Sequence, residues 1–127
     1  AYRHVVIGSR YKIKTTGYQI HEVVDILGLQ NNGEPHGEFI FANHINKFVA
    51  YFCNSDKDKI KDLDYRETIL DSKVKKFVSS AYNYIETHAR RFLAMMESGE
   101  IEITHDFYLK KFQLSNPKLN YDYILFD

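Results

Sequence analysis

The chain has 127 residues, with 17 basic and 17 acidic side chains and therefore no formal net charge at neutral pH. This length fits a single domain over residues 1–127. A neutral chain lacks the basic excess that dedicated nucleic-acid binders use to neutralise phosphates. Cys53 is the only cysteine, so an intrachain disulfide is excluded and we expect a reducing compartment. We find no apolar stretch long enough for a signal peptide or a membrane span, so we expect no membrane association.

The first predicted element is a β-hairpin over residues 2–15. Residues 4–7 and 11–14 are rich in β-branched and aromatic side chains and flank Gly8 and Ser9. A Gly-Ser pair suits a type II′ turn, because glycine accepts a positive φ at the first central position.

Two helices follow, separated by a predicted loop over residues 30–37. The first spans residues 18–27, where apolar residues recur at helical spacing and Gly28 can end the helix in the left-handed conformation. The second begins near residue 38 and ends at residues 53–55, because it carries a continuous apolar face. That face consists of Phe41, His44, Ile45, Phe48, Val49 and Phe52.

A long core helix is predicted over about residues 72–98. Its start could lie as early as residue 65, because Asp64 and Glu67 have the spacing of a capping box. No glycine or proline interrupts the pattern before Gly99, which has the place of a left-handed C′ residue. The inward-facing candidates, spaced alternately by four and three, are Val74, Val78, Ala81, Ile85, His88, Phe92 and Met95.

The C-terminal part is expected to supply strands. Residues 100–104 alternate between polar and apolar side chains, and residues 121–126 are aromatic and aliphatic enough for a last strand. Between them, Asp106 can cap a short helical turn. The predicted fold class is therefore α+β: an N-terminal β-hairpin, central helices with one long core helix, and C-terminal strands that complete a small antiparallel sheet. The last strand could pair within the chain or with another chain.

The histidines offer few metal-binding patterns. His21 and Asp25 are spaced like the two ligands of an HExxH zinc site, but no third ligand accompanies them. We interpret the pair as an exposed polar face, and we expect neither a metal site nor a cofactor. His88 falls in the apolar seam of the long helix, so it is either a core histidine bonded by a tyrosine or a pocket histidine with a shifted pKa. His44 is the second candidate for a proton carrier.

Four basic or amide side chains are candidates for binding a phosphate: Arg90, Arg91, Lys47 and Asn43. An arginine pair can hold a phosphate or carboxylate through two hydrogen bonds each. The alternative for the arginines is ordinary surface charge, balanced by neighbouring glutamates. No phosphate-binding glycine loop of the Walker type is present.

About residues 18–90 show a recognisable order of elements. An aromatic residue is followed by an Ile-x-x-Val helix that ends in Gly-Leu, then by a second helix and a Lys-rich helix. The residues concerned are Tyr18, Asn43, Lys47, Phe48, Lys75 and Lys76. In this progression the chain resembles phage-encoded small nucleotide-kinase-like proteins. The resemblance implies phosphoryl transfer between nucleotides without a Walker loop. Residues 18–29 are also similar to the opening helix of helix-turn-helix modules of the excisionase type.

Three functions are therefore compared. The first is a small binding or assembly protein, of phage or mobile-element type, that docks on a protein partner or on itself in the host cytoplasm; the many Tyr and Phe side chains favour it. The second is a nucleotide-binding, kinase-like enzyme that uses the phosphate-binding candidates with His88 or His44. The third is a nucleic-acid-binding regulator that uses the basic doublets at residues 75–76, 90–91 and 110–111. We expect the first.

Overall fold

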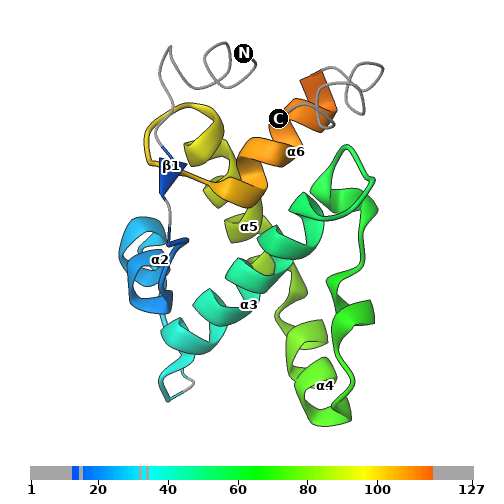
Figure 1. Ribbon diagram of the computed structural model, residues 1–127. Helices are drawn as coiled ribbons and strands as arrows, with labels where there is room; N and C mark the ends of the chain where they lie inside the picture. The colour runs from blue at the N-terminus through cyan, green and yellow to red at the C-terminus, as the bar shows by residue number, and fades with distance from the viewer. Residues whose placement is uncertain (1–12, 15, 32, 34, 116–127) are drawn as a thin grey trace.

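The computed structural model describes residues 13, 14, 16–31, 33 and 35–115 (Figure 1). This part of the chain is mostly helical, with five α-helices, two short 3-10 helices and two very short strands. The elements are β1 (Ile13–Lys14), α2 (Ile20–Leu27), α3 (Gly37–Cys53), η1 (Ile60–Asp62), η2 (Tyr65–Thr68), α4 (Ser72–Ser80), α5 (Tyr82–Glu97), β2 (Ile103–Thr104) and α6 (His105–Ser115).

The boundaries of α2 follow from local side-chain chemistry. The carboxylate of Glu22 accepts the backbone N–H of Gln19 across 2.8 Å, which satisfies a donor at the helix start. Gly28 ends the helix with a φ of 62°, in the left-handed region. Both the helix and its glycine cap are as the spacing predicts, and so is the end of α5, where Gly99 has a φ of 81°.

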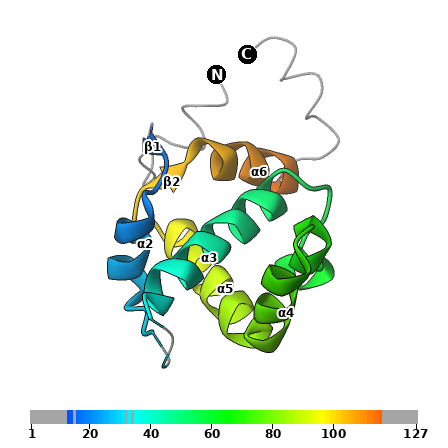
Figure 2. The same ribbon diagram turned by 90° about the horizontal axis from the view of Figure 1, so that it is seen from below.

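Helix α3 forms the centre of the core (Figure 2). It packs against α2 on one flank and against α5, which crosses it, and α6 lies across its C-terminal end. The predicted apolar face of α3 is confirmed, because all six of its members are buried. On α5 the buried side chains are Ile85, Ala89, Phe92 and Met96. None of the helices in the described part is long and apolar enough to cross a membrane.

The prediction of one long core helix is wrong, because the helix is broken at Ala81. This residue has a φ of −114° and a ψ of 19°, ends α4 and precedes α5. The break turns the two helices relative to each other, so a single four-three spacing does not describe both. Val78, Ile85 and Phe92 are buried as predicted, whereas Val74 is exposed and Ala81, His88 and Met95 are only partly buried.

The start of α4 also differs from the earlier of the two predicted starts. Asp71 caps α4 by accepting the N–H groups of Lys73 and Val74. Asp64 caps the separate 3-10 helix η2 by accepting the N–H of Arg66, and no continuous helix joins η2 to α4.

The predicted α+β fold with an antiparallel, hairpin-based sheet is wrong as well. β1 pairs with β2 in parallel, with Ile13 opposite Ile103 and Lys14 opposite Thr104. Residues 2–12 and 15 of the predicted hairpin and the predicted strand at 121–126 lie outside the described residues. The alternating pattern of a strand indicates its two faces but not its partner, and this partner is distant in the sequence.

Candidate binding site

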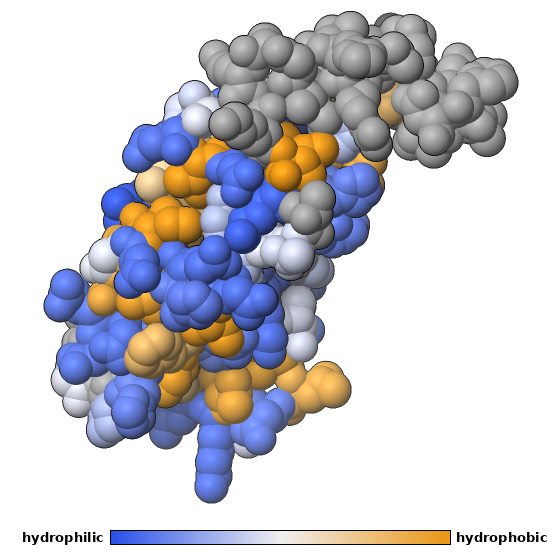
Figure 3. Space-filling model, turned by 60° about the vertical axis from the view of Figure 1, so that its left-hand side comes forward, coloured by the Kyte–Doolittle hydropathy of each residue, from blue (hydrophilic) through white to orange (hydrophobic). Residues whose placement is uncertain are grey.

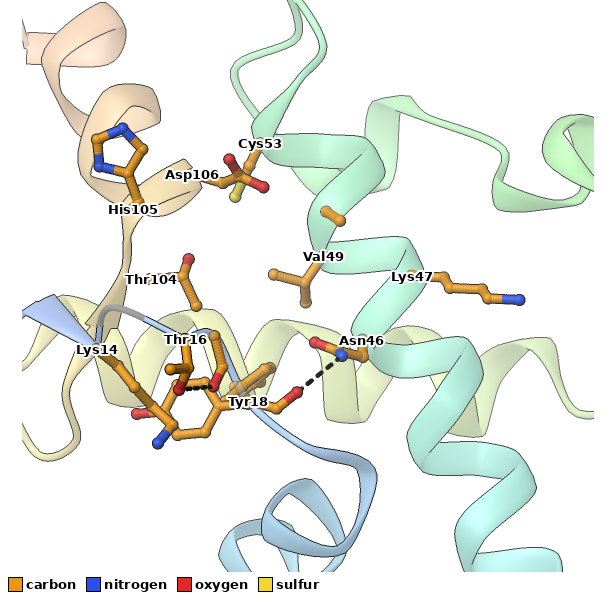
Figure 4. A pocket seen from close by; sticks show the side chains of 13 residues that line it. Lys14, Thr16, Tyr18, Asn46, Lys47, Val49, Cys53, Thr104, His105 and Asp106 are labelled. Atoms are coloured by element: carbon orange, nitrogen blue, oxygen red, sulfur yellow. Dashed lines mark hydrogen bonds between the residues drawn. The ribbon is translucent and has the colours of Figure 1, made fainter.

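A hollow of about 420 Å³ lies where the carboxyl ends of β1 and β2 approach α3 (Figure 4). The ends of parallel strands are the usual position of ligand sites in open sheets, although this sheet has only two strands in the described part. The lining residues are Lys14, Thr16, Gly17, Tyr18, Asn46, Lys47, Val49, Ala50, Cys53, Phe92, Thr104, His105 and Asp106.

Tyr18 forms one wall and is held at three points. Its hydroxyl donates to the carbonyl oxygen of Glu102, its own carbonyl accepts from Nδ2 of Asn46 across 3.3 Å, and its ring meets the ring of Phe92 edge-on at 5.1 Å between centroids. Burial, with the nearby carboxylate of Glu102, raises the pKa of Tyr18 to about 12. The phenol therefore remains neutral near pH 7 and acts as a fixed wall rather than as a proton carrier.

The charges around the hollow are largely compensated or directed elsewhere. Nζ of Lys14 lies 3.1 Å from a carboxylate oxygen of Glu22. The side chain of Lys47 points away from the other labelled side chains, whereas Asp106 points toward Cys53 (Figure 4). A ligand would thus meet hydroxyl, amide and aromatic groups together with one carboxylate.

Cys53 is a buried thiol on the wall of this hollow. Burial, and then the charge of Asp106, raises the pKa of the thiol to about 12. Because the thiolate is the nucleophilic form of cysteine, this group is inert at neutral pH.

His88 belongs to a different contact, at the junction of α2 and α5. Nη1 of Arg91 donates to the carbonyl oxygen of Leu27 across 3.2 Å and lies 3.0 Å from Nδ1 of His88. A guanidinium group can only donate, so Nδ1 accepts and the proton of the neutral ring is on Nε2. Partial burial, and then the charge of Arg91, lowers the pKa of His88. The ring also packs edge-on against Tyr84.

His44 is a core residue on the side of α3 that faces η2 and α4. Its Nδ1 lies 2.9 Å from the hydroxyl of Tyr65, and the rings of Tyr65 and Phe77 lie next to it. Burial, and then the charge of Lys47, lowers the pKa of His44. His44 does not line the hollow.

The four predicted phosphate-binding residues are not brought together in this hollow. Lys47 lines it, while Asn43 lies elsewhere on α3, Arg90 is exposed on α5, and Arg91 binds the end of α2. A role in phosphate binding remains a prediction for each of them.

Of the three basic doublets, the one on α6 (residues 110–111) binds groups within the chain. Nζ of Lys110 is buried and donates to backbone carbonyl groups, and Lys111 pairs with Glu97.

His21 and Asp25 are both exposed on α2, which confirms that they form a polar face. Within the described ranges, no group of three or more His, Cys, Asp or Glu side chains is placed to hold a metal ion.

Most lining residues of the hollow escaped the sequence analysis. Thr104 is the last residue of β2, Asp106 is predicted only as a helix cap, and Asn46 lies on α3 two positions from the predicted His44, so no local motif joins the three. The available signal is positional: polar residues at and directly after the end of a short strand, here Thr104 and Asp106, lie at the sheet edge where ligands bind, although the sequence analysis interprets Asp106 as a cap. Comparisons of the chain with protein-family models, with curated proteins and with solved structures give no match.

Proposed function

We propose that this chain is a binding protein that docks on a macromolecular partner, or on another copy of itself, through the end of the molecule that carries α4. The observation that carries this proposal is the exposure of Leu70. This leucine lies in the connection between η2 and α4, and 99% of its surface is accessible to solvent. Covering a leucine side chain completely contributes about 1.5–3 kcal/mol, so Leu70 is an unused source of binding free energy.

The surroundings of Leu70 support the same reading. Val74, one helical turn further along, is 37% exposed, and Val78 is the only fully buried side chain of α4. Figure 3 shows apolar atoms scattered among hydrophilic ones over the whole visible face of the molecule, its lower end included. Single exposed apolar residues are common on monomers, so the proposal depends on the complete exposure of Leu70 in the connection before α4.

We place this docking in the cytoplasm of a host, as for a phage or mobile-element protein. The free, protonated thiol of Cys53 accords with a reducing compartment.

The test is a photo-crosslinking amino acid incorporated at position 70, in the cells that express the protein. A matched control carries it at position 109, because Leu109 is also a partly exposed leucine and lies on α6, at the other end of the molecule in Figure 1. The captured partner, which could be the chain itself, is then purified and titrated against Leu70→Asp and Leu109→Asp. We expect Leu70→Asp to weaken binding at least about tenfold and Leu109→Asp to leave it nearly unchanged. Equal binding by both variants, or no adduct specific to position 70, would contradict the proposal.

Nucleotide binding at the hollow is the second candidate. Its volume of about 420 Å³ lies in the range of small-molecule sites, and the ring of Tyr18 and the amide of Asn46 could contact a base. A nucleoside mono- or triphosphate at about one hundred times its dissociation constant would stabilise the folded state by roughly 2.7 kcal/mol. A thermal-shift series with these nucleotides tests this, with Asn46→Ala expected to remove the shift. No shift with any nucleotide contradicts it.

A further inference from the structure

A second hollow, of about 480 Å³, lies between η2 and α4, and we call it the charged trough. The side near η2 is formed by Asp64, Arg66 and Glu67, and the α4 side by Ser72, Lys75, Lys76 and Ser79. The two sides are joined by residues 69–71, which include the exposed Leu70; Leu70 itself does not line the trough.

The two sides of the trough carry opposite charge. On the η2 side, Nε and Nη2 of Arg66 bind both carboxylate oxygens of Asp64, at 2.8 and 3.0 Å, so these two charges cancel. Glu67 is exposed and leaves this side negative. On the α4 side, Lys75 and Lys76 are exposed and form no ion pair within 4 Å of a described residue, although the charge of Lys75 helps to lower the pKa of Asp64 across the trough.

A surface with a negative and a positive stripe side by side is complementary to itself. A two-fold rotation about an axis parallel to the stripes places the negative stripe of one copy on the positive stripe of the other. Such isologous contacts are the commonest arrangement of homodimers. The absence of net charge on the whole chain also means that two copies do not repel each other at long range.

Leu70 completes this arrangement. It belongs to residues 69–71, which join the two stripes, and the axis of the arrangement is placed through this connection. A residue near a two-fold axis meets the same residue of the partner, so two fully exposed leucines would cover each other.

We infer that the occupant of the α4 end is a second copy of this chain. The two copies form a symmetric dimer in which Glu67 faces Lys76 of the partner subunit and Leu70 packs on Leu70 of the partner subunit. This inference rests on the proposed docking function and names the partner.

The first experiment measures the mass of the wild-type chain by sedimentation and light scattering, from about 1 μM to about 1 mM. We expect a monomer–dimer equilibrium, and Leu70→Asp is expected to raise the dissociation constant at least about tenfold, with Leu109→Asp as the matched control. A wild-type chain that is monomeric throughout this range overturns the inference.

The second experiment exchanges the charges. Glu67→Lys places like charges opposite each other in the symmetric dimer, and so does Lys76→Glu, so each variant alone is expected to dimerise several-fold more weakly. A mixture of the two restores both opposite-charge contacts and is expected to form a heterodimer about as tight as the wild type. Equal dimerisation of the single variants and the mixture overturns the proposed pairing.

A third variant reports on the axis itself. Leu70→Cys is expected to form a disulfide-linked dimer under mild oxidation, because cysteines near a two-fold axis can approach within disulfide distance. Leu109→Cys is the control and is expected to remain monomeric. If the chain is monomeric while position 70 crosslinks to a different protein, the dimer is wrong and the docking function stands. If position 70 crosslinks to nothing, both fail.

Discussion

Nζ of Lys110 donates to the carbonyl oxygen of Ser55 across 2.8 Å and thereby ties α6 to the turn that follows α3. The same ammonium group donates to the carbonyl oxygen of Lys57 and to Oε1 of Gln113, and it lies 4.6 Å from the ring centre of Phe52. Lys110 is only 1% exposed. A lysine has three N–H donors, and the three oxygens satisfy all of them, which makes burial of the charge tolerable.

Replacing this lysine should therefore destabilise the fold. Lys110→Met keeps the aliphatic volume but leaves the carbonyl groups of Ser55 and Lys57 without their donor, and we expect a loss of roughly 2 kcal/mol in the free energy of unfolding. That loss corresponds to a decrease of roughly 5–10 °C in the melting temperature. The neighbouring Lys111→Met provides the control, since its partner Glu97 is at the surface, and should cost about 1 kcal/mol or less. Equal effects of the two substitutions would show that the buried contacts of Lys110 contribute nothing.

Acidification should destabilise the protein below about pH 6.5. The folded-state pKa of both His44 and His88 is lowered, first of all by burial, from the ordinary value of 6.5. Between the folded and unfolded pKa values, the unfolded chain binds more protons, so stability is complete above pH 6.5 and is lost as the pH falls.

Urea unfolding at pH 7.5, 6 and 5 measures this loss of stability. The pH range isolates the histidines, because carboxylates such as Glu22 and Asp64, whose pKa values are lowered, titrate at still lower pH. His44→Gln should flatten the dependence, and the exposed His21→Gln should not. A free energy of unfolding that is constant or rises between pH 7.5 and pH 5 contradicts the assignment.

The thiol of Cys53 should be protected in the folded protein. With its pKa raised to about 12, its thiolate fraction at pH 8 is roughly a thousandfold lower than that of an ordinary cysteine. We expect a chromogenic disulfide reagent to react very slowly with the folded protein in buffer. It should react at once in about 6 M urea, a concentration chosen to lie above the unfolding midpoint. Rapid labelling without denaturant would place the thiol at the surface.

Two glycines should respond differently to alanine. A Cβ at Gly37 would clash with the backbone oxygen of Asn31, so Gly37→Ala forces the loop before α3 to move and should cost roughly 1–3 kcal/mol or more. Gly28 has open space around a Cβ, but its φ of 62° disfavours any L side chain, and Gly28→Ala should cost about 1–2 kcal/mol. Thermal unfolding measures both, and a Gly37→Ala protein as stable as the wild type would contradict the close approach.

Local patterns predicted α2, α3 and the end of α5 because the causes of these features are local, whereas α6, expected only as a short helical turn, is a helix of 11 residues. The apolar face of α3 and the glycine cap at Gly28 depend on residues within a few positions of each other. The break at Ala81 had no such signal, since alanine favours helices. It accompanies distant contacts: the hydroxyl of Tyr82, the next residue, donates to the carbonyl of Leu63 and accepts from the N–H of Tyr65.

The sheet and the candidate site depend on contacts that are distant in the sequence. The hydroxyl of Tyr18 bonds to Glu102, 84 positions away, and Nζ of Lys110 bonds to a carbonyl 55 positions away. No periodicity encodes such a pairing. The exposure of Leu70 could not be predicted from the sequence either, because an apolar residue beside a helix is expected to belong to the core until the packing is known.

The parallel pairing of Ile13 with Ile103 has a consequence for the order of folding. It closes a loop that contains α2, α3, α4 and α5, and the entropy of closing a loop grows with its length. The helices inside this loop can pack together first, and the strand pair then forms late in folding. A variant without β1 would thus lose the contacts between β1 and α6, while the crossing of α3 and α5 would persist.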